Sequence, residues 1–149
     1  MEFVLDHSYF MKKALQEAET AYEKGEVPVG AVITVNDRII ARAHNLTEKL
    51  GDVTAHAEMQ AITAAANFLG GKYLHNCILY VTLEPCQMCA GALYWSQISK
   101  VVFGAYDPQR GFSSAGGKLH PKTELVGGIM ENEASSLLRQ FFIQKRNLN

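Results

Sequence analysis

The sequence has few cysteines and no long apolar run, and each shortage excludes a class of protein. Its three cysteines, Cys77, Cys86 and Cys89, are too few and odd in number for the disulfide framework of a small secreted domain. No apolar run approaches the roughly 18 residues of a membrane helix, and residues 1–13 lack the basic, apolar and cleavage regions of a signal peptide. We therefore expect a cytoplasmic protein with no membrane partner.

The chain also lacks an excess of either charge, with 14 basic and 15 acidic residues and a formal net charge of -1. Composition alone therefore gives no sign of a polyanion as partner. The apolar share of 48% excludes a disordered chain. A length of 149 residues is the usual size of one compact domain, so we expect a single domain over residues 1–149.

The spacing of apolar residues predicts alternating helices and strands. Apolar residues recur every three or four positions over residues 8–24 and 131–146, which is typical of amphipathic helices. β-branched runs at 29–35 and 38–43 flank Asn36-Asp37, which predicts a β-hairpin. Further buried strands are expected at 77–83 and 100–105.

Cap and turn residues place the remaining elements. Thr54 can cap a helix over residues 57–69 that ends at Gly70, and Pro85 precedes a helix that opens with Cys86. A Gly- and Ser-rich stretch at 111–117 predicts a loop. Strands separated by a helix normally lie parallel through right-handed crossovers. The order of elements therefore predicts an α/β protein, a three-layer α/β/α sandwich with a central mixed sheet of about five strands.

One cluster of residues indicates a metal centre. His56 and Cys86 begin two predicted helices, and sheet-based folds place their sites at such ends. The spacing of Cys86 and Cys89 puts both sulfurs on one helix face, where the helix N-terminus favours thiolates. With His56 these ligands are one short of a closed zinc site, which leaves a position for water. Since zinc lowers the pKa of such a water to about 7, the pattern indicates a hydrolytic site with one zinc ion per subunit.

Glu58 is expected to act as an acid and base and not as a ligand. It lies roughly 200° around an ideal helix from His56, so the two side chains are not neighbours there. A carboxylate near the reacting water can instead move its proton to the substrate. Cys-x-x-Cys alone would fit a redox pair and His-x-Glu alone is weak, so the combination carries the hypothesis. Cys77, inside an apolar strand, is expected to be a buried hydrophobic residue.

The motifs H-A-E at 56–58 and P-C-Q-M-C at 85–89 resemble the signature of the zinc-dependent cytidine and deoxycytidylate deaminase superfamily. That resemblance implies that His56, Cys86 and Cys89 hold zinc and that Glu58 transfers the proton. Longer segments resemble the tRNA-specific adenosine deaminase branch: VPVGAV (27–32), DVTAHAE (52–58), LYVTLEPC (79–86), MCAGAL (88–93), VVFGA-x-D (101–107) and LLRQFFIQKR (137–146). The branch implies a homodimer that converts the wobble adenosine of a tRNA anticodon arm to inosine.

The resemblance also implies roles for residues around the metal. Asn45 would orient the target nucleoside, the backbone of Ala57 would line the base pocket, and Asp107 would lie beside the flanking anticodon nucleotide. The implied reaction is attack of a zinc-activated water on C6 of adenine, with Glu58 protonating the ring and then the departing ammonia. Asn45 and Asp107 also suit ordinary turns, so a structural role stays open for both.

The candidate RNA contacts lie within residues 108–149. Residues 108–125 differ from the longer Gly- and Ala-rich segment of the branch, a region that contributes to RNA contacts there. Residues 118–149 carry five basic and three acidic residues, which suits either phosphate contacts or a solvated face. The candidate RNA contacts are Arg110, Lys118, Lys122, Arg139, Lys145 and Arg146, together with His120.

Two further expectations follow from residues 92–97. Leu93, Tyr94 and Trp95 are consecutive on a short predicted helix, so at least one faces outward unless it is covered, either by a dimer partner or by the sheet itself. The segment ALYWSQ also resembles the guanine deaminase branch. Together with the near-neutral charge, this keeps open a deaminase of a free nucleobase or nucleoside, such as guanine, cytosine or cytidine.

Overall fold

Residues 6–147, which the computed structural model describes, contain one five-stranded sheet in the order β2-β1-β3-β4-β5. The strands are β1 (Gly30–Val35), β2 (Arg38–His44), β3 (Cys77–Leu83), β4 (Lys100–Ala105) and β5 (Glu124–Val126). The helices are α1 (His7–Glu23), α2 (Thr47–Leu50), α3 (Ala57–Leu69), α4 (Gln87–Ser96), α5 (Phe112–Ala115) and α6 (Glu131–Asn147).

The sheet is mixed, as the order of elements predicts. β1 pairs antiparallel with β2 and β3, whereas β4 runs parallel to β3 and β5. Asn36 and Asp37 turn the chain between β1 and β2 with φ values of 51° and 60°, the left-handed conformation of a type I′ hairpin turn. The parallel pairing of β3 and β4 puts their carboxyl ends at one edge of the sheet, where folds of this kind place their sites.

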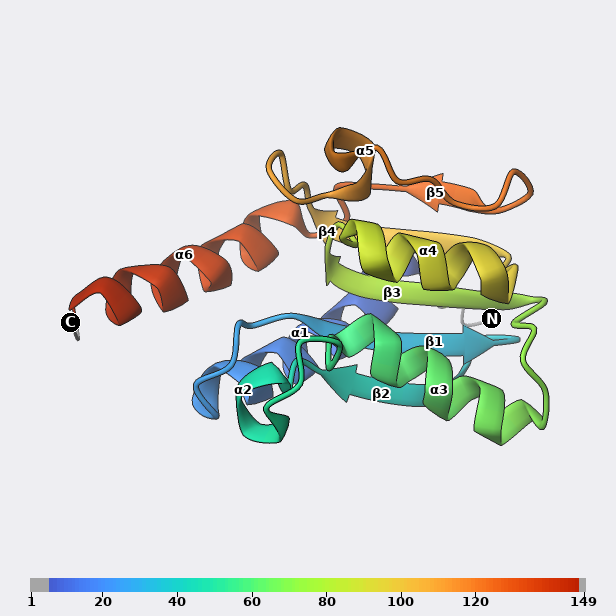
Figure 1. Ribbon diagram of the computed structural model, residues 1–149, viewed down its shortest axis with the longest axis horizontal. Helices are drawn as coiled ribbons and strands as arrows, with labels where there is room; N and C mark the ends of the chain where they lie inside the picture. The colour runs from blue at the N-terminus through green and yellow to red at the C-terminus, as the bar shows by residue number, and fades with distance from the viewer. Residues whose placement is uncertain (1–5, 148–149) are drawn as a thin grey trace, which may run out of the picture.

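Helices cover both faces of the sheet and form three layers (Figure 1). α1 packs on one face, where Phe10 meets Tyr80. α3 and α4 lie on the other face, toward the viewer, where Ala61 and Leu93 pack with Leu79. Leu79 and Tyr80 thus point to opposite faces, as the two-residue period of a strand requires. The predicted three-layer α/β/α sandwich is confirmed.

α1 lies so close to β1 that only glycine fits at Gly30. A Cβ there would stand 2.1 Å from the backbone oxygen of Ala14 and 2.4 Å from the backbone nitrogen of Ala18. Both alanines are completely buried. The small residues therefore let the helix backbone touch the strand, which fixes the layer behind the sheet.

α6 closes the described chain and extends beyond the sheet. Its first half packs on β4, and Ala134 and Phe141 are its buried residues. Beyond Phe141 the helix is exposed and projects from the body, with its last described turn at the far left of Figure 1. No helix in the part of the chain described here has the length and apolarity needed to cross a membrane.

Three elements differ from the sequence-based expectation. The helices α2 and α5 have four residues each, and β5 has three, so none shows a periodic pattern. The predicted cap at Thr54 is wrong, because the Asp52 carboxylate accepts hydrogen bonds from the Thr54 amide at 2.8 Å and hydroxyl at 2.7 Å. These bonds hold Thr54 in a turn before the helix, and the N-cap of α3 is His56.

Candidate active site

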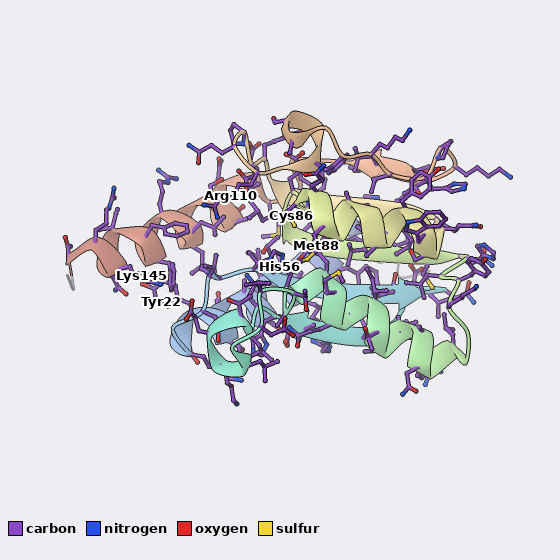
Figure 2. All side chains as sticks on the ribbon, in the orientation of Figure 1. Tyr22, His56, Cys86, Met88, Arg110 and Lys145 are labelled. Atoms are coloured by element: carbon purple, nitrogen blue, oxygen red, sulfur yellow. The ribbon has the colours of Figure 1, made fainter. Side chains whose placement is uncertain are left out.

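His56, Cys86 and Cys89 come together where α3 and α4 begin. His56 is the N-cap of α3 and Cys86 is the N-cap of α4, each with extended backbone, and Cys89 lies in the first turn of α4. The His56 Nδ1 is 3.6 Å from the Cys86 Sγ and 3.5 Å from the Cys89 Sγ. Figure 2 shows His56 and Cys86 at these adjoining helix ends.

The spacing of these three atoms fits zinc. A tetrahedral ion with a Zn–N bond near 2.0–2.1 Å and Zn–S bonds near 2.3 Å separates the nitrogen from each sulfur by about 3.6 Å. The two observed N–S distances lie within 0.1 Å of that value. All three ligand atoms lie within 4.8 Å of one another, and they form the metal-binding group found among residues 6–147.

The three groups also shift one another's proton affinity. The hydrogen bond with Cys89, together with the nearby His56, lowers the pKa of Cys86 to about 4 despite its partial burial. The same hydrogen bond raises the pKa of Cys89, and contact with Cys86 raises the pKa of His56. One thiolate is therefore already present at neutral pH, where it attracts a cation.

Glu58 shares a cavity with the candidate ligands. It lies in the first turn of α3 and is 4% exposed. Burial raises the pKa of its carboxyl to about 7, with the Cys86 thiolate adding to the rise. The cavity has a volume of about 590 Å³ and also exposes His56 and Cys86. That volume suits a small organic group such as a nucleoside.

Asn45 lines this cavity with its carboxamide fixed. Its Oδ1 accepts a hydrogen bond of 2.8 Å from the backbone N–H of Ala57. That bond fixes the orientation of the amide and leaves its NH₂ group able to donate to a ligand. Ala57, whose backbone is expected to line the base pocket, is completely buried and is not among the residues that line this cavity.

The loop after β4 forms one rim of the cavity. Asp107 and Arg110 line it, as do Tyr106 and Gln109. The Asp107 Oδ1 accepts hydrogen bonds from the backbone N–H groups of Gln109 at 3.2 Å and Arg110 at 3.0 Å. Asp107 therefore makes the turn that was one of its two expected roles, and it does so at the cavity edge.

Two buried carboxylates of this region did not stand out in the sequence. Glu26, 1% exposed, accepts backbone hydrogen bonds from Glu48 at 3.0 Å and Lys49 at 2.8 Å and so holds α2. Glu84, 4% exposed, lines the cavity and holds the loop after β4. Each carboxylate bonds to residues more than 20 positions away, so no local pattern marks them. Other lining residues that the sequence analysis missed are Val27, Val29, Thr47, Leu83, Leu138 and Phe142.

The structure does not bring all candidate RNA contacts together. Arg110 lies at the cavity, and a neighbouring hollow on α6 is lined by Arg139, Lys145 and Arg146. Leu138 and Phe142 line both hollows, so the basic surface formed by Arg139, Lys145 and Arg146 adjoins the cavity. Figure 2 shows Lys145 on the projecting end of α6.

The remaining candidates follow α4 away from the cavity. Gly117 lies against Gln87 at the start of α4, and the His120 ring is 5.5 Å from that of Tyr94 near its end. Lys122 just precedes Thr123, whose hydroxyl donates to the Ile98 carbonyl before β4 begins. Lys118 therefore lies between the two ends of α4. Lys122 lies near the start of β4, at the end of the sheet away from the cavity.

Comparison with known proteins agrees with this geometry. Residues 5–105 match the family model described as the cytidine and deoxycytidylate deaminase zinc-binding region. The chain belongs to the cytidine and deoxycytidylate deaminase family. Zinc is therefore its cofactor, as predicted, and the His/Cys/Cys group is placed to bind it.

Within this family the predicted resemblance to tRNA-specific adenosine deaminases is confirmed. The chain is 48% identical over 143 residues to the tRNA-specific adenosine deaminase of Bacillus subtilis, covering 92% of this chain and 89% of that protein. A solved structure from studies of A-to-I editing by tRNA:A34 deaminases at the wobble position superposes with a TM-score of 0.80 at 42% identity, covering 88% of this chain and 99% of that one.

The chain is also similar to a protein of the guanine deaminase branch. The guanine deaminase of Bacillus subtilis superposes with a TM-score of 0.66 at 38% identity, over 75% of this chain and 69% of that one. Its fit covers less of both chains than the tRNA:A34 deaminase structure does.

Proposed function

We propose that this protein deaminates the wobble adenosine of a tRNA anticodon arm to inosine. The observation that carries the proposal is the continuity of the site: Glu58, His56 and Cys86 line a cavity that adjoins the basic surface of α6. A cavity sized for one nucleoside, joined to a basic surface, suits a base flipped out of an RNA loop. The similarity to tRNA-specific adenosine deaminases supports the same substrate.

The residues divide the work in the following way. His56, Cys86 and Cys89 hold zinc, which when bound lowers the pKa of water enough to supply a nucleophile at neutral pH. Glu58 takes one proton from that water and delivers it to a nitrogen of the adenine ring, and it then takes the remaining proton of the added oxygen and delivers it to the amino group. Water adds at C6, the C6–N bond breaks, and ammonia leaves. Asn45 donates from its fixed NH₂ group to the nucleoside.

A substrate panel at fixed salt tests the proposal. The purified protein is incubated with an anticodon stem-loop carrying adenosine at the wobble position and, separately, with adenosine, guanine, cytosine and cytidine. We expect inosine in the stem-loop and no change in the free compounds. Turnover of guanine with an inert stem-loop would overturn the proposal and support the free-base deaminase that the weaker likeness to guanine deaminase favours.

The basic residues of α6 are expected to bind phosphates. Replacing both Lys145 and Arg146 by Ala should lower kcat/KM for the stem-loop, because two phosphate contacts are lost. The slope of log(kcat/KM) against log salt should flatten by about 1–2, since each contact with single-stranded nucleic acid contributes about 0.7. Lys72→Ala, at an exposed lysine near the opposite end of α3, is the control. An unchanged slope in the double variant would place the phosphate contacts elsewhere.

We further propose that the protein is a homodimer formed through the face of α3 and α4. On α4, Leu93 is buried whereas Trp95 is 77% exposed, and Phe68 on α3 is 57% exposed. Exposed aromatic groups of this size on two neighbouring helices favour burial against a second copy.

Trp95→Ala tests the dimer by removing the most exposed ring of that face. Sedimentation at micromolar concentration should give a dimer for the unmodified protein and a shift toward monomer for the variant. A monomeric unmodified protein would contradict the dimer, and an unshifted variant would contradict this face.

The domain and compartment remain part of the same proposal. Residues 1–149 would form one catalytic domain in the cytoplasm. Three free cysteines, two of them candidate zinc ligands, suit a reducing compartment that keeps thiols available for metal.

A further inference from the structure

Glu84 joins the two ends of the loop that forms the cavity rim. Its Oε1 accepts a hydrogen bond of 3.1 Å from the backbone N–H of Asp107. Its Oε2 accepts from the backbone N–H of Ser113 at 3.1 Å and from the hydroxyl of Ser113 at 2.5 Å. One buried carboxylate thus spans residues 107–113, and both of its oxygens are used.

Gly111 shows how closely the loop wraps around this carboxylate. A Cβ at Gly111 would lie 2.4 Å from the Glu84 Cδ and 2.5 Å from the backbone oxygen of Asp107. Its φ of -61° is one that any residue adopts, so the glycine is required by space and not by backbone conformation. The loop is also tied to the segment between β3 and the metal centre, since the Phe112 N–H donates to the Pro85 carbonyl at 2.9 Å.

We propose that Glu84 is a positioning residue that fixes the 107–113 rim so that Asp107 and Arg110 can receive the nucleotides flanking the reacting adenosine. The inference rests on the proposed RNA substrate. Glu84 itself makes no contact with the reacting atoms in this role. It limits the conformations of the rim before RNA binds. Less conformational entropy is then lost on binding, so RNA binds more tightly.

Two substitutions disturb the same contact from opposite sides. Glu84→Gln replaces one acceptor oxygen by an NH₂ group, which cannot accept the N–H of Asp107 or Ser113. Gly111→Ala leaves Glu84 intact but forces its carboxyl and the loop apart. For both variants we expect KM for the stem-loop to rise by about tenfold, while kcat stays within about threefold and zinc content is unchanged.

A double-mutant cycle separates this contact from general damage. Glu84→Ala removes the carboxyl that a Cβ at position 111 would strike and leaves its close approach to the Asp107 carbonyl oxygen, so Gly111→Ala should raise KM less in the Glu84→Ala background than in the unmodified protein. Gly71→Ala, at a glycine with open space around it, controls for the added methyl group. Ser96→Ala, which removes a buried hydroxyl bonded to the Leu93 carbonyl far from the rim, controls for lost stability. Additive effects in the cycle would overturn the proposal.

Amide hydrogen exchange tests the anchor without any substrate. Glu84→Gln should expose the N–H group of Asp107 or of Ser113, whichever meets the new NH₂ group, to faster exchange and leave the sheet amides unchanged. If the unmodified protein fails to deaminate the stem-loop, the proposed function fails but this measurement still judges the anchor. Loss of zinc, a fall in kcat with unchanged KM, or unchanged exchange at both amides would overturn the positioning role.

Discussion

Glu58→Gln is expected to lower kcat for the stem-loop by about 10³-fold or more while leaving zinc bound. Gln has nearly the same shape as Glu, but its amide neither accepts a proton from water nor delivers one to the adenine ring. General acid and base catalysis by one group contributes about 10² to 10⁴ in rate, and Glu58 serves in more than one proton transfer. Because Glu58 is buried beside the candidate ligands and is not one of them, the metal should stay.

The measurement compares single-turnover rates and zinc stoichiometry in the same preparations. Glu124→Gln is the matched control, since that carboxylate is exposed and pairs with Lys100 at the opposite edge of the sheet. It should keep full activity. A Glu58→Gln protein with zinc bound and a rate within tenfold of the unmodified protein would remove Glu58 from the proton transfers.

The long elements of the fold could be predicted because their signals are local. Apolar spacing marks α1 and α6, and the left-handed pair Asn36-Asp37 marks the hairpin. β5 could not be found in this way. Its three residues form a strand only because they pair with residues 100–102 of β4, and no pattern within residues 124–126 indicates that contact.

The centre of the site was predictable for a similar reason, and its rim was not. His56 and Cys86 each stand at the start of a helix, so their position follows from local structure. Glu84 lies only two residues before Cys86, yet its partners come from the segment 107–113. Which loop returns to a buried carboxylate depends on the whole chain path. The same holds for the candidate RNA contacts. Their positions in the sequence do not reveal that Arg139, Lys145 and Arg146 lie beside the cavity whereas Lys122 lies at the far end of β4.

Cys86→Ala is expected to abolish both zinc binding and deamination. Two ligands, His56 and Cys89, would remain of three, and the one thiol whose pKa is strongly lowered would be gone. Activity should therefore fall below detection. Cys77→Ala provides a matched control, because Cys77 is a free, completely buried cysteine on β3 outside the metal-binding group. It should keep zinc and activity and lose only the stability of one small core side chain, on the order of 1 kcal/mol.

The thermal stability of Cys86→Ala should also no longer depend on zinc. This is a stricter test of the ligand set than loss of activity. A ligand at 1,000 times its Kd stabilises the folded state by about 4 kcal/mol, or roughly 10 °C in Tm for a domain of this size. A chelator should therefore lower the Tm of the unmodified protein and of Cys77→Ala by a similar amount. For Cys86→Ala, whose Tm should already be low, the chelator should change nothing. A chelator-sensitive Tm in Cys86→Ala would mean that zinc is held by other residues, and the ligand set proposed here would be wrong.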